Sequence, residues 1–528
     1  MPLFKKKAEE QHGQENRESM DNAEQAPPDE RTGLFPNRDG SSRNLNTALL
    51  TPDDLAVSPY NLRSIRILRY FSLLFIMMAF VWWVLLLVSL FVTPPGFHTR
   101  GSGFLAFGFA TLTMANMGFV LVFFGVPSKS VRILALAMSL LLFLDLILLL
   151  AVQQTRYEEG WVGIASVIWA LHVSLWILLT DRLVKWGKGE EEERLTGRVE
   201  TRRTLAEWLV VMVSANAYVM IVIAVVLITL TIILRAVDAG FAPPGKMYSV
   251  DGGNYRIHVY CHGNKTNKYG EVLPTVLFEG GEEPVEQGLW RLGDNVIRNG
   301  SISRYCFADR PGIAWSDAAP SPLSAGFAVD ALSEALAKAG EAGPWVLAGA
   351  GIGSFYSRVF SSRHGHDVKG ILLVDPFHED LLSEWASAGR GFILWLRGII
   401  SPLGLDRLSG AIFRGRNSQD RIYGRSVHQS SKFILAKLQE NLVLNSVTKH
   451  DVQSSRQIQE KDTPLVVVSS GREVNRSREW EKKQQDLTRL TDNLKGWDIV
   501  FEAPHKVWDT LAGREVIEQR LQRLVKED

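Results

Sequence analysis

The chain has 528 residues, and its 58 Lys and Arg residues almost balance 57 Asp and Glu residues, giving a formal net charge of +1. A chain without a strong excess of positive charge lacks the electrostatic field that holds nucleic acid, so we expect no nucleic-acid partner. Its two cysteines, Cys261 and Cys306, are too few for a four-ligand zinc site or a disulfide-rich scaffold. We therefore expect neither a metal nor another cofactor.

Residues 1–66 are rich in Glu, Asp, Gln, Asn, Pro and Arg and contain few large apolar side chains. Such a segment cannot bury enough apolar surface to offset the entropy lost on ordering. The sequence therefore predicts a disordered N-terminal tail.

Five apolar segments follow the tail, each about as long as the roughly 20 residues that a helix needs to cross a bilayer. The remainder of the chain has no such run, so residues 67–235 are predicted to form a five-helix transmembrane domain. The segments comprise residues 71–92, 104–124, 133–152, 161–180 and 208–234.

The basic residues that flank these segments predict their orientation. Twelve Lys and Arg residues fall on the side of the N-terminal tail, and only four fall on the other side. Because Lys and Arg are retained in the cytosol, the tail is expected there, and the C-terminal part on the lumenal or extracellular side of an endomembrane. A mitochondrial membrane is the alternative. Three N-x-S/T sequons in the C-terminal part, at Asn264, Asn299 and Asn475, agree with a lumenal location.

Two ionisable residues lie within the predicted spans, Asp145 in the third and His172 in the fourth. Such groups are costly in lipid and usually face a partner or a cavity. Counted from the turn predicted at residues 153–160, both lie at depths that would allow a contact between adjacent helices. We expect a structural polar pair, and the alternative is part of a proton or ion pathway.

From about residue 245 the pattern changes to short apolar runs that alternate with helical stretches. This alternation is typical of a mostly parallel sheet covered by helices on both faces. One α/β domain over residues 245–528 is predicted. The predicted strands are residues 256–261, 275–278, 304–308, 346–348, 371–374, 465–468 and 499–501.

Three separated blocks of this domain, residues 309–317, 343–353 and 370–376, resemble the α/β-hydrolase superfamily in order and spacing. The resemblance covers essentially all of residues 247–528. The whole layout also resembles a group of fungal membrane proteins that combine a multi-helix N-terminal region of unknown function with such a domain. The resemblance implies a nucleophile on a sharp strand-to-helix turn, a histidine base, an acid that orients it and backbone donors for an oxyanion.

Residues 349–353 read Gly-Ala-Gly-Ile-Gly and match the G-x-S-x-G nucleophile turn, except that Gly351 stands where the serine is expected. Glycine has no side chain that can attack a carbonyl carbon. Ser354 lies three residues further on, inside the predicted helix, and is a weak surrogate.

The remaining site residues follow from the same resemblance. His505 stands where the base is expected, Glu473 is the first candidate for the acid, and Asp375 is the alternative. Gly280 and Gly281 would form the oxyanion loop, with the Ile352 N–H as a second donor. Relatives often carry histidine at the position of Glu279, and a carboxylate there is expected to repel an oxyanion.

Residues 380–460 would form a helical cap over the site. Their apolar segment 391–400 is expected to pack within the cap, and the alternative is a lid that selects an acyl ligand and touches the bilayer. In this fold Cys261 and Cys306 fall on neighbouring strands, so the resemblance also makes a disulfide plausible.

The leading hypothesis is a membrane protein whose hydrolase-like domain has lost its nucleophile and binds a lipid or acyl ligand, or acts as a scaffold for other membrane proteins. The first alternative is an active ester or lipid hydrolase that uses Ser354 or a water activated by His505. A transporter with a regulatory domain is the second alternative, and it depends on Asp145, His172, Asn116 and Asn216.

Overall fold

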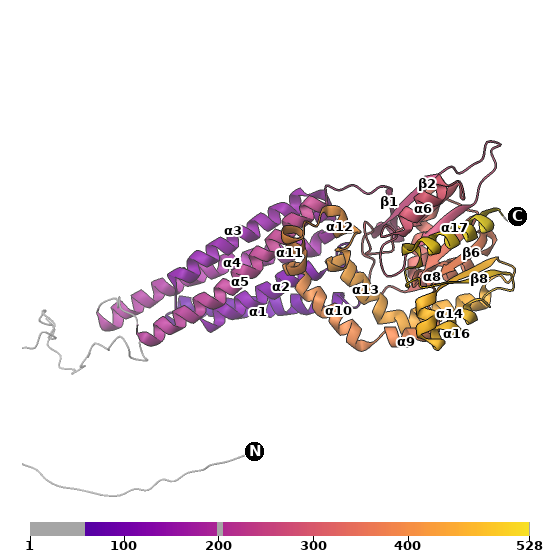
Figure 1. Ribbon diagram of the computed structural model, residues 1–528. Coiled ribbons are helices and arrows are strands. Elements are labelled where there is room, and N and C mark those ends of the chain that lie inside the picture. Colours follow the sequence, from indigo (N-terminus) through magenta and orange to yellow (C-terminus); the bar gives the residue numbers. More distant parts are fainter. Residues whose placement is uncertain (1–58, 198–203, 527–528) are drawn as a thin grey trace, which may run out of the picture. The chain divides into compact units, whose positions relative to one another are not determined.

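The computed structural model describes residues 59–197 and 204–526 (Figure 1). The predicted disordered tail lies outside the described residues up to residue 58. Its last part differs from the prediction, because residues 59–61 form a short 3-10 helix and α1 begins at Arg63.

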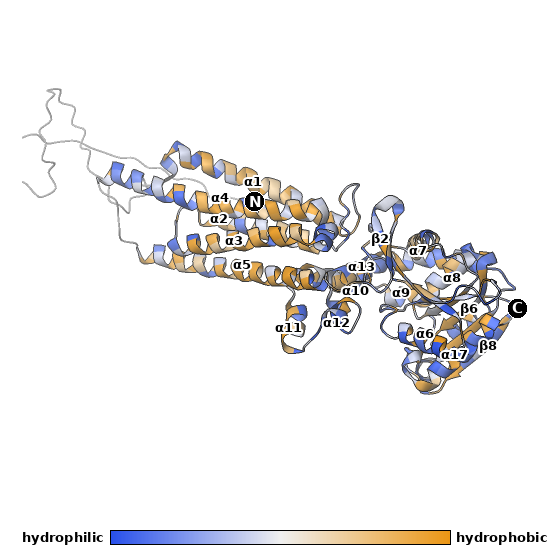
Figure 2. Ribbon diagram, turned by 90° about the horizontal axis from the view of Figure 1, so that it is seen from above, coloured by the Kyte–Doolittle hydropathy of each residue, from blue (hydrophilic) through white to orange (hydrophobic). Residues whose placement is uncertain are grey.

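Five long helices form the N-terminal part of the described chain, and they coincide with the five predicted apolar segments. By length and composition, each is a candidate to cross a membrane. Apolar residues run along most of their length in Figure 2. The helices are α1 (Arg63–Ser89), α2 (Phe104–Val122), α3 (Lys129–Ala151), α4 (Gln153–Thr196) and α5 (Leu205–Asp238).

The predicted polar pair between the third and fourth segments is not formed. Asp145 is fully buried and lies beside Thr229 of α5. His172 is exposed and stacks on the Trp169 ring, with 5.4 Å between the ring centroids. Residues 153–160 are helical rather than a turn, and a break at Gly160, with φ +58°, separates them from the rest of α4. A depth count along two helices does not fix which way each side chain points.

The four residues behind the transporter hypothesis do not face one path. Asn116 is buried and donates to the Met138 sulfur, whereas Asn216 and His172 are exposed on the outside of their helices.

An eight-stranded sheet follows, with the order β1-β2-β4-β3-β5-β6-β7-β8. β1 and β2 pair antiparallel, β2 and β4 pair antiparallel, and the other neighbours are parallel. The seven predicted strands are present, and β1 was missed because it is short and half-exposed. The strands are β1 (Lys246–Val250), β2 (Tyr255–Gly263), β3 (Thr275–Glu279), β4 (Arg304–Ala308), β5 (Trp345–Ala350), β6 (Val368–Val374), β7 (Leu465–Ser470) and β8 (Leu494–Val500).

Helices cover both faces of the sheet (Figure 1). Successive strand residues point to opposite faces, so Leu347 of β5 packs with α7 (Ala325–Ala339) and α8 (Gly353–Arg363). Val346 packs on the other face with α6 (Leu289–Arg298) and α17 (Leu511–Lys526). Both faces are apolar and buried, which explains why the strands read as continuous apolar runs.

The two cysteines form a disulfide, as the resemblance suggested. Cys261 of β2 and Cys306 of β4 are directly paired in the antiparallel register, and their Cα atoms are 4.1 Å apart.

Helices inserted between β6 and β7 form the cap, and they contact the long N-terminal helices. The prediction that segment 391–400 packs within the cap is only partly right. One side of α10, around Gly398, packs on the Phe104 ring of α2. The other side leaves Phe392, Ile393 and Leu396 exposed, each by more than 40%. The cap helices are α9 (Leu382–Trp385), α10 (Ala388–Ile400), α11 (Leu405–Phe413), α12 (Ser418–Ile422), α13 (Ser431–Val443) and α14 (Lys449–Ile458).

Candidate active site in the hydrolase-like domain

The turn between β5 and α8 keeps the backbone shape that presents a nucleophile. Gly351 has φ +53°, a left-handed conformation that is strained for residues with a side chain. A Cβ at Gly349 would lie 2.5 Å from the Ser357 hydroxyl, and a Cβ at Gly353 would lie 2.4 Å from the Gly280 carbonyl oxygen. Glycine is therefore required at the two flanking positions so that the strand, helix and oxyanion loop can approach closely.

His505, the predicted base, is paired with Asp375, the alternative candidate for the acid. The imidazole Nδ1 lies 2.5 Å from Asp375 Oδ2. The other carboxylate oxygen accepts hydrogen bonds from the Ser470 backbone N–H at 3.0 Å and the Trp480 indole N–H at 3.2 Å. Three contacts thus fix the fully buried carboxylate, which leaves His505 Nε2 free to face the turn.

The first candidate for the acid, Glu473, does not reach His505. It lies in the first turn of α15 (Gly471–Arg476), where its backbone N–H donates to Ser470 Oγ. Its carboxylate pairs weakly with Arg476 at 4.0 Å. The alternative candidate, Asp375, contacts His505 instead, because it follows β6 at the carboxyl edge of the sheet and lies beside the end of β7.

His505 faces the turn at Gly351, whereas Ser354 does not reach the surface of the site. A Cβ built on Gly351 would lie 2.9 Å from His505 Nε2, so the imidazole is directed at the position of the absent side chain. Ser354 is fully buried in the first turn of α8, and its hydroxyl has no hydrogen-bond partner among the described residues. A buried hydroxyl cannot meet a substrate, so the geometry does not support Ser354 as a surrogate.

The predicted oxyanion loop adjoins the turn and is held by ionic contacts. The Arg310 guanidinium donates to the Gly281 carbonyl oxygen at 2.5 Å, and a Cβ at Gly281 would lie 3.4 Å from the Ala350 carbonyl oxygen. Lys437 of the cap contacts Glu282 at 3.3 Å, and Lys506 pairs with Glu283. The cap and the loop after β8 therefore fix the oxyanion loop from two sides.

Glu279 does not repel an oxyanion in the way the sequence suggested. Its carboxyl group lines a small internal cavity with Arg310 and Tyr356, on the face of the sheet that α7 and α8 cover. Burial raises its pKa to about 8, although the Arg310 charge opposes the shift. The group is therefore mostly uncharged at neutral pH.

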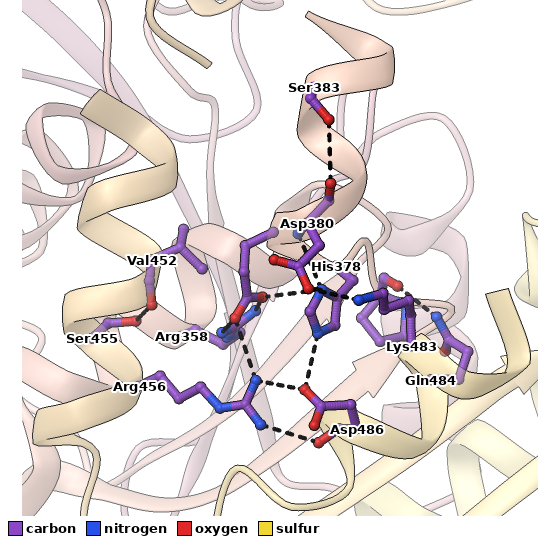
Figure 3. Close-up of polar contacts among 12 residues, drawn as sticks. Arg358, His378, Asp380, Ser383, Val452, Ser455, Arg456, Lys483, Gln484 and Asp486 are labelled. Carbon is purple, nitrogen blue, oxygen red and sulfur yellow. Dashed lines mark hydrogen bonds and ion pairs between the residues drawn. The ribbon is translucent and has the colours of Figure 1, made fainter. Parts of the chain in front are cut away.

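An ionic network surrounds His378, which follows Asp375 closely in the chain (Figure 3). His378 Nε2 lies 2.9 Å from Asp486, which also accepts from Arg456 at 2.6 Å. The Arg358 guanidinium contacts Glu379 at 2.7 Å and holds the pKa of that carboxyl at about 2, despite its burial. Sequence reasoning missed this network because its members come from segments far apart in the chain. It fixes the segment that follows Asp375.

A second buried group contains His258, Glu286 and Asp309, whose ligand atoms are close enough to hold a metal ion. The Gly245 backbone N–H donates to His258 Nε2 at 3.1 Å, so the imidazole carries its proton on Nδ1, which faces Asp309 at 3.0 Å. A protonated nitrogen is not a metal ligand. Burial, followed by the Asp309 charge, raises the pKa of Glu286, so this donor set fits a shared proton better than a metal ion.

The strand order, the glycine turn and the His505–Asp375 pair define an α/β-hydrolase-like domain, and the five preceding helices are long enough to anchor it in a membrane. A protein of Schizosaccharomyces pombe, "Uncharacterized protein C23C11.06c", is 32% identical over 540 residues, which cover 96% of this chain and 98% of the relative. The chain therefore belongs to the same family as this fission-yeast protein.

Two further comparisons also found matches. Residues 30–261 match a family model described as a region of unknown function, DUF2417. An "Uncharacterized vacuolar membrane protein" of Saccharomyces cerevisiae is 26% identical over 386 residues, which cover 62% of this chain and 60% of the relative. The name of the budding-yeast relative, together with the five apolar helices, supports an integral membrane protein of the endomembrane system.

Solved α/β-hydrolases resemble the C-terminal half. The enol-lactonase of Burkholderia xenovorans is 12% identical and covers 53% of this chain and 100% of its own, with a TM-score of 0.37. An esterase of Exiguobacterium antarcticum is 16% identical and covers 54% and 100%, also with a TM-score of 0.37. The fold assignment rests on the strand order and the glycine turn.

Proposed function

We propose that the C-terminal domain binds a lipid or acyl ligand at the former nucleophile turn and does not hydrolyse it by serine chemistry. The observation that carries this proposal is Gly351, which keeps the φ of a nucleophile turn and lacks the attacking atom. A covalent acyl-enzyme cannot form at a residue that has no side chain.

A lipid or acyl ligand is favoured over a water-soluble one by the surroundings of the cap. Gly404, at the start of α11, lies against Thr231 of α5, and Pro402 lies against Gly108 of α2. The cap thus contacts helices that can span a membrane, and its helix α11 exposes Ile412 by 67%. An apolar ligand can pass from the bilayer to such a cap without crossing water. The same exposed surface could hold another membrane protein, which is the scaffold form of the proposal.

Lumenal placement of this domain is part of the proposal. The three sequon residues are exposed on the domain, and the Cys261–Cys306 disulfide is the kind of bond that persists in oxidising compartments. The vacuolar location in the name of the budding-yeast relatives supports an endomembrane.

A second candidate function is hydrolysis by a water that His505 activates. The specific observation in its favour is the intact His505–Asp375 pair at 2.5 Å, because a binding site alone does not need a positioned base. The water would take the space next to Nε2 where a serine hydroxyl would stand. Turnover by the unaltered chain that depends on His505 would distinguish this candidate.

Ligand binding is tested by blocking the turn. Binding of a fluorescent long-chain acyl ester to the purified full chain is measured for the unaltered protein, Gly351→Leu and Gly340→Leu. Both glycines have positive φ, but a Cβ at Gly340 meets no atom within 4 Å, so Gly340→Leu controls for backbone strain. We expect Gly351→Leu to weaken binding about tenfold or more, because its side chain fills the space in front of His505. Equal affinity in all three proteins would contradict the proposal.

A further inference from the structure

A second pocket, of about 380 Å³, lies between the long helices and the hydrolase-like domain. Residues at the start of α4, the end of α5, the linker to β1 and the cap helices line it. It shares no lining residue with the turn at Gly351, so it is separate from the site discussed above.

The pocket is lined by more basic than acidic side chains. Arg235 pairs with Glu158 and Glu159, each at 2.7 Å. Arg407 and Arg421 share one carboxylate, that of Asp238, each at 2.5 Å.

Two further cations face the same space. Arg256 pairs with the buried Asp317 at 2.9 Å. Lys432 forms no close ion pair among the described residues, although its charge acts on Glu158 and Asp317. The pKa of Arg407 is lowered, first by burial and also by the nearby arginines, although Asp238 opposes the shift. The five basic side chains at the pocket therefore outnumber, by one, the four carboxylates next to them.

Unused hydrogen-bond donors point to a missing acceptor. Ser102 lines the pocket, is only 2% exposed, and its hydroxyl has no partner among the described residues. The Arg407 Nε–H is also buried without a partner in that part of the chain. Buried donors are normally satisfied, so both call for an acceptor such as a phosphate oxygen.

The rest of the pocket is apolar. Phe241, Met247, Trp315 and Phe433 line it beside the cations. The pocket therefore has a basic part and an apolar part, which together would complement an amphiphile with an anionic headgroup.

The pocket lies at one end of the helices that are candidates to cross a membrane. α4 begins at Gln153, α5 ends at Asp238 and α2 begins at Phe104, so all three meet the pocket at the end of the bundle that continues into the hydrolase-like domain. Lipid phosphates lie at this level of a membrane that the helices span.

We propose that this pocket binds the phosphate group of an anionic phospholipid, with Lys432, Arg407 and Ser102 contacting the phosphate and the aromatic side chains contacting the first part of an acyl chain. Such a lipid would join the membrane helices to the hydrolase-like domain. This site goes beyond the proposed function, because it does not involve the turn at Gly351.

The test uses the full chain, delipidated in a mild detergent, and fluorescent phosphatidic acid as the probe. Lys432→Gln and Ser102→Ala each remove one contact, and Lys268→Gln is the matched control, since Lys268 is an exposed lysine in the loop after β2. We expect Lys432→Gln to weaken binding about tenfold, the effect of losing one charge-assisted contact. Ser102→Ala, a small change in a buried site, should weaken binding by a smaller factor, and Lys268→Gln should leave it unchanged.

Competitors distinguish lipid from free phosphate. Unlabelled phosphatidic acid should displace the probe, whereas phosphatidylcholine and inorganic phosphate should do so only at much higher concentration. Equal binding by Lys432→Gln, Ser102→Ala and the unaltered chain would overturn the proposal, and so would displacement by inorganic phosphate at the same concentration as phosphatidic acid. Gly351→Leu distinguishes the two proposed sites. This variant should bind phosphatidic acid as tightly as the unaltered chain, whether or not the turn at Gly351 binds a ligand.

Discussion

Gly351 has the positive φ expected of a nucleophile turn, but it lacks a side chain that could act as the nucleophile. The flanking glycines let the turn pack closely, and His505, paired with Asp375, faces it, whereas Gly351 has no side chain that could attack a carbonyl carbon. The assignments of Gly351 to the nucleophile position and of His505 to the base come from the sequence and stay predictions. The sequence could not choose the acid. It left Asp375 and Glu473 open as the acid, since both follow apolar strands. Only the register of β6 beside β7 decides between them.

The buried carboxyl group of Glu279 should make the stability of the protein depend on pH. Its pKa rises from an ordinary 4.5 to about 8 on folding, because the carboxyl is buried. Between these two pH values the folded protein holds a proton that the unfolded chain has lost, so stability falls as pH rises from 4.5 towards 8 and levels off above. Glu279→Gln removes this dependence.

We therefore expect Glu279→Gln to gain stability over the unaltered chain by roughly 3 to 4 kcal/mol more at pH 8 than at pH 5. The difference in stability is followed by the midpoint of thermal unfolding, recorded by tryptophan fluorescence at each pH. Glu481→Gln changes an exposed helix carboxyl and serves as the control. A constant difference between Glu279→Gln and the unaltered chain across this range would show that the Glu279 carboxyl is charged in the folded protein.

The sequence predicted which segments form helices and strands. It did not predict how the side chains of one helix face the neighbouring helices. Five apolar runs predicted five helices, and seven strands were found from short apolar runs. The Asp145–His172 contact failed because depth along a helix does not determine the direction of a side chain around it. Segment 391–400 was expected inside the cap, yet half of α10 is exposed, because only one side of the helix packs on α13 and α2.

The exposed side of the cap should lie in the bilayer surface. Phe413, at the end of α11, is 83% exposed, and Tyr269, in the loop between β2 and β3, is 90% exposed. We expect a fluorophore on Phe413→Cys to be quenched by brominated lipids in nanodiscs, and one on Tyr269→Cys to remain unquenched. Equal quenching at the two positions would show that α11 has no special contact with lipid.

For the whole molecule, the flanking charges and the disulfide support the proposed orientation, with the hydrolase-like domain in the lumen. In sealed microsomes we expect protease to leave this domain intact until detergent is added. Enzymatic deglycosylation should increase gel mobility, and the increase should become smaller as Asn264, Asn299 and Asn475 are each changed to Gln. Loss of the domain to protease in sealed vesicles would place it in the cytosol and contradict the charge rule.

The most direct test of the account is ester turnover by the purified full chain, measured for the unaltered protein, Gly351→Ser and Gly351→Ser combined with His505→Ala. Acyl esters of graded chain length serve as substrates. A serine at 351 would stand within reach of His505 Nε2, although the ring must shift slightly to admit its Cβ. We predict an inert unaltered chain, turnover about tenfold or more above background for Gly351→Ser, and its loss when His505 is also changed. Turnover by the unaltered chain that His505→Ala abolishes would contradict the account and show that a water activated by His505 performs hydrolysis.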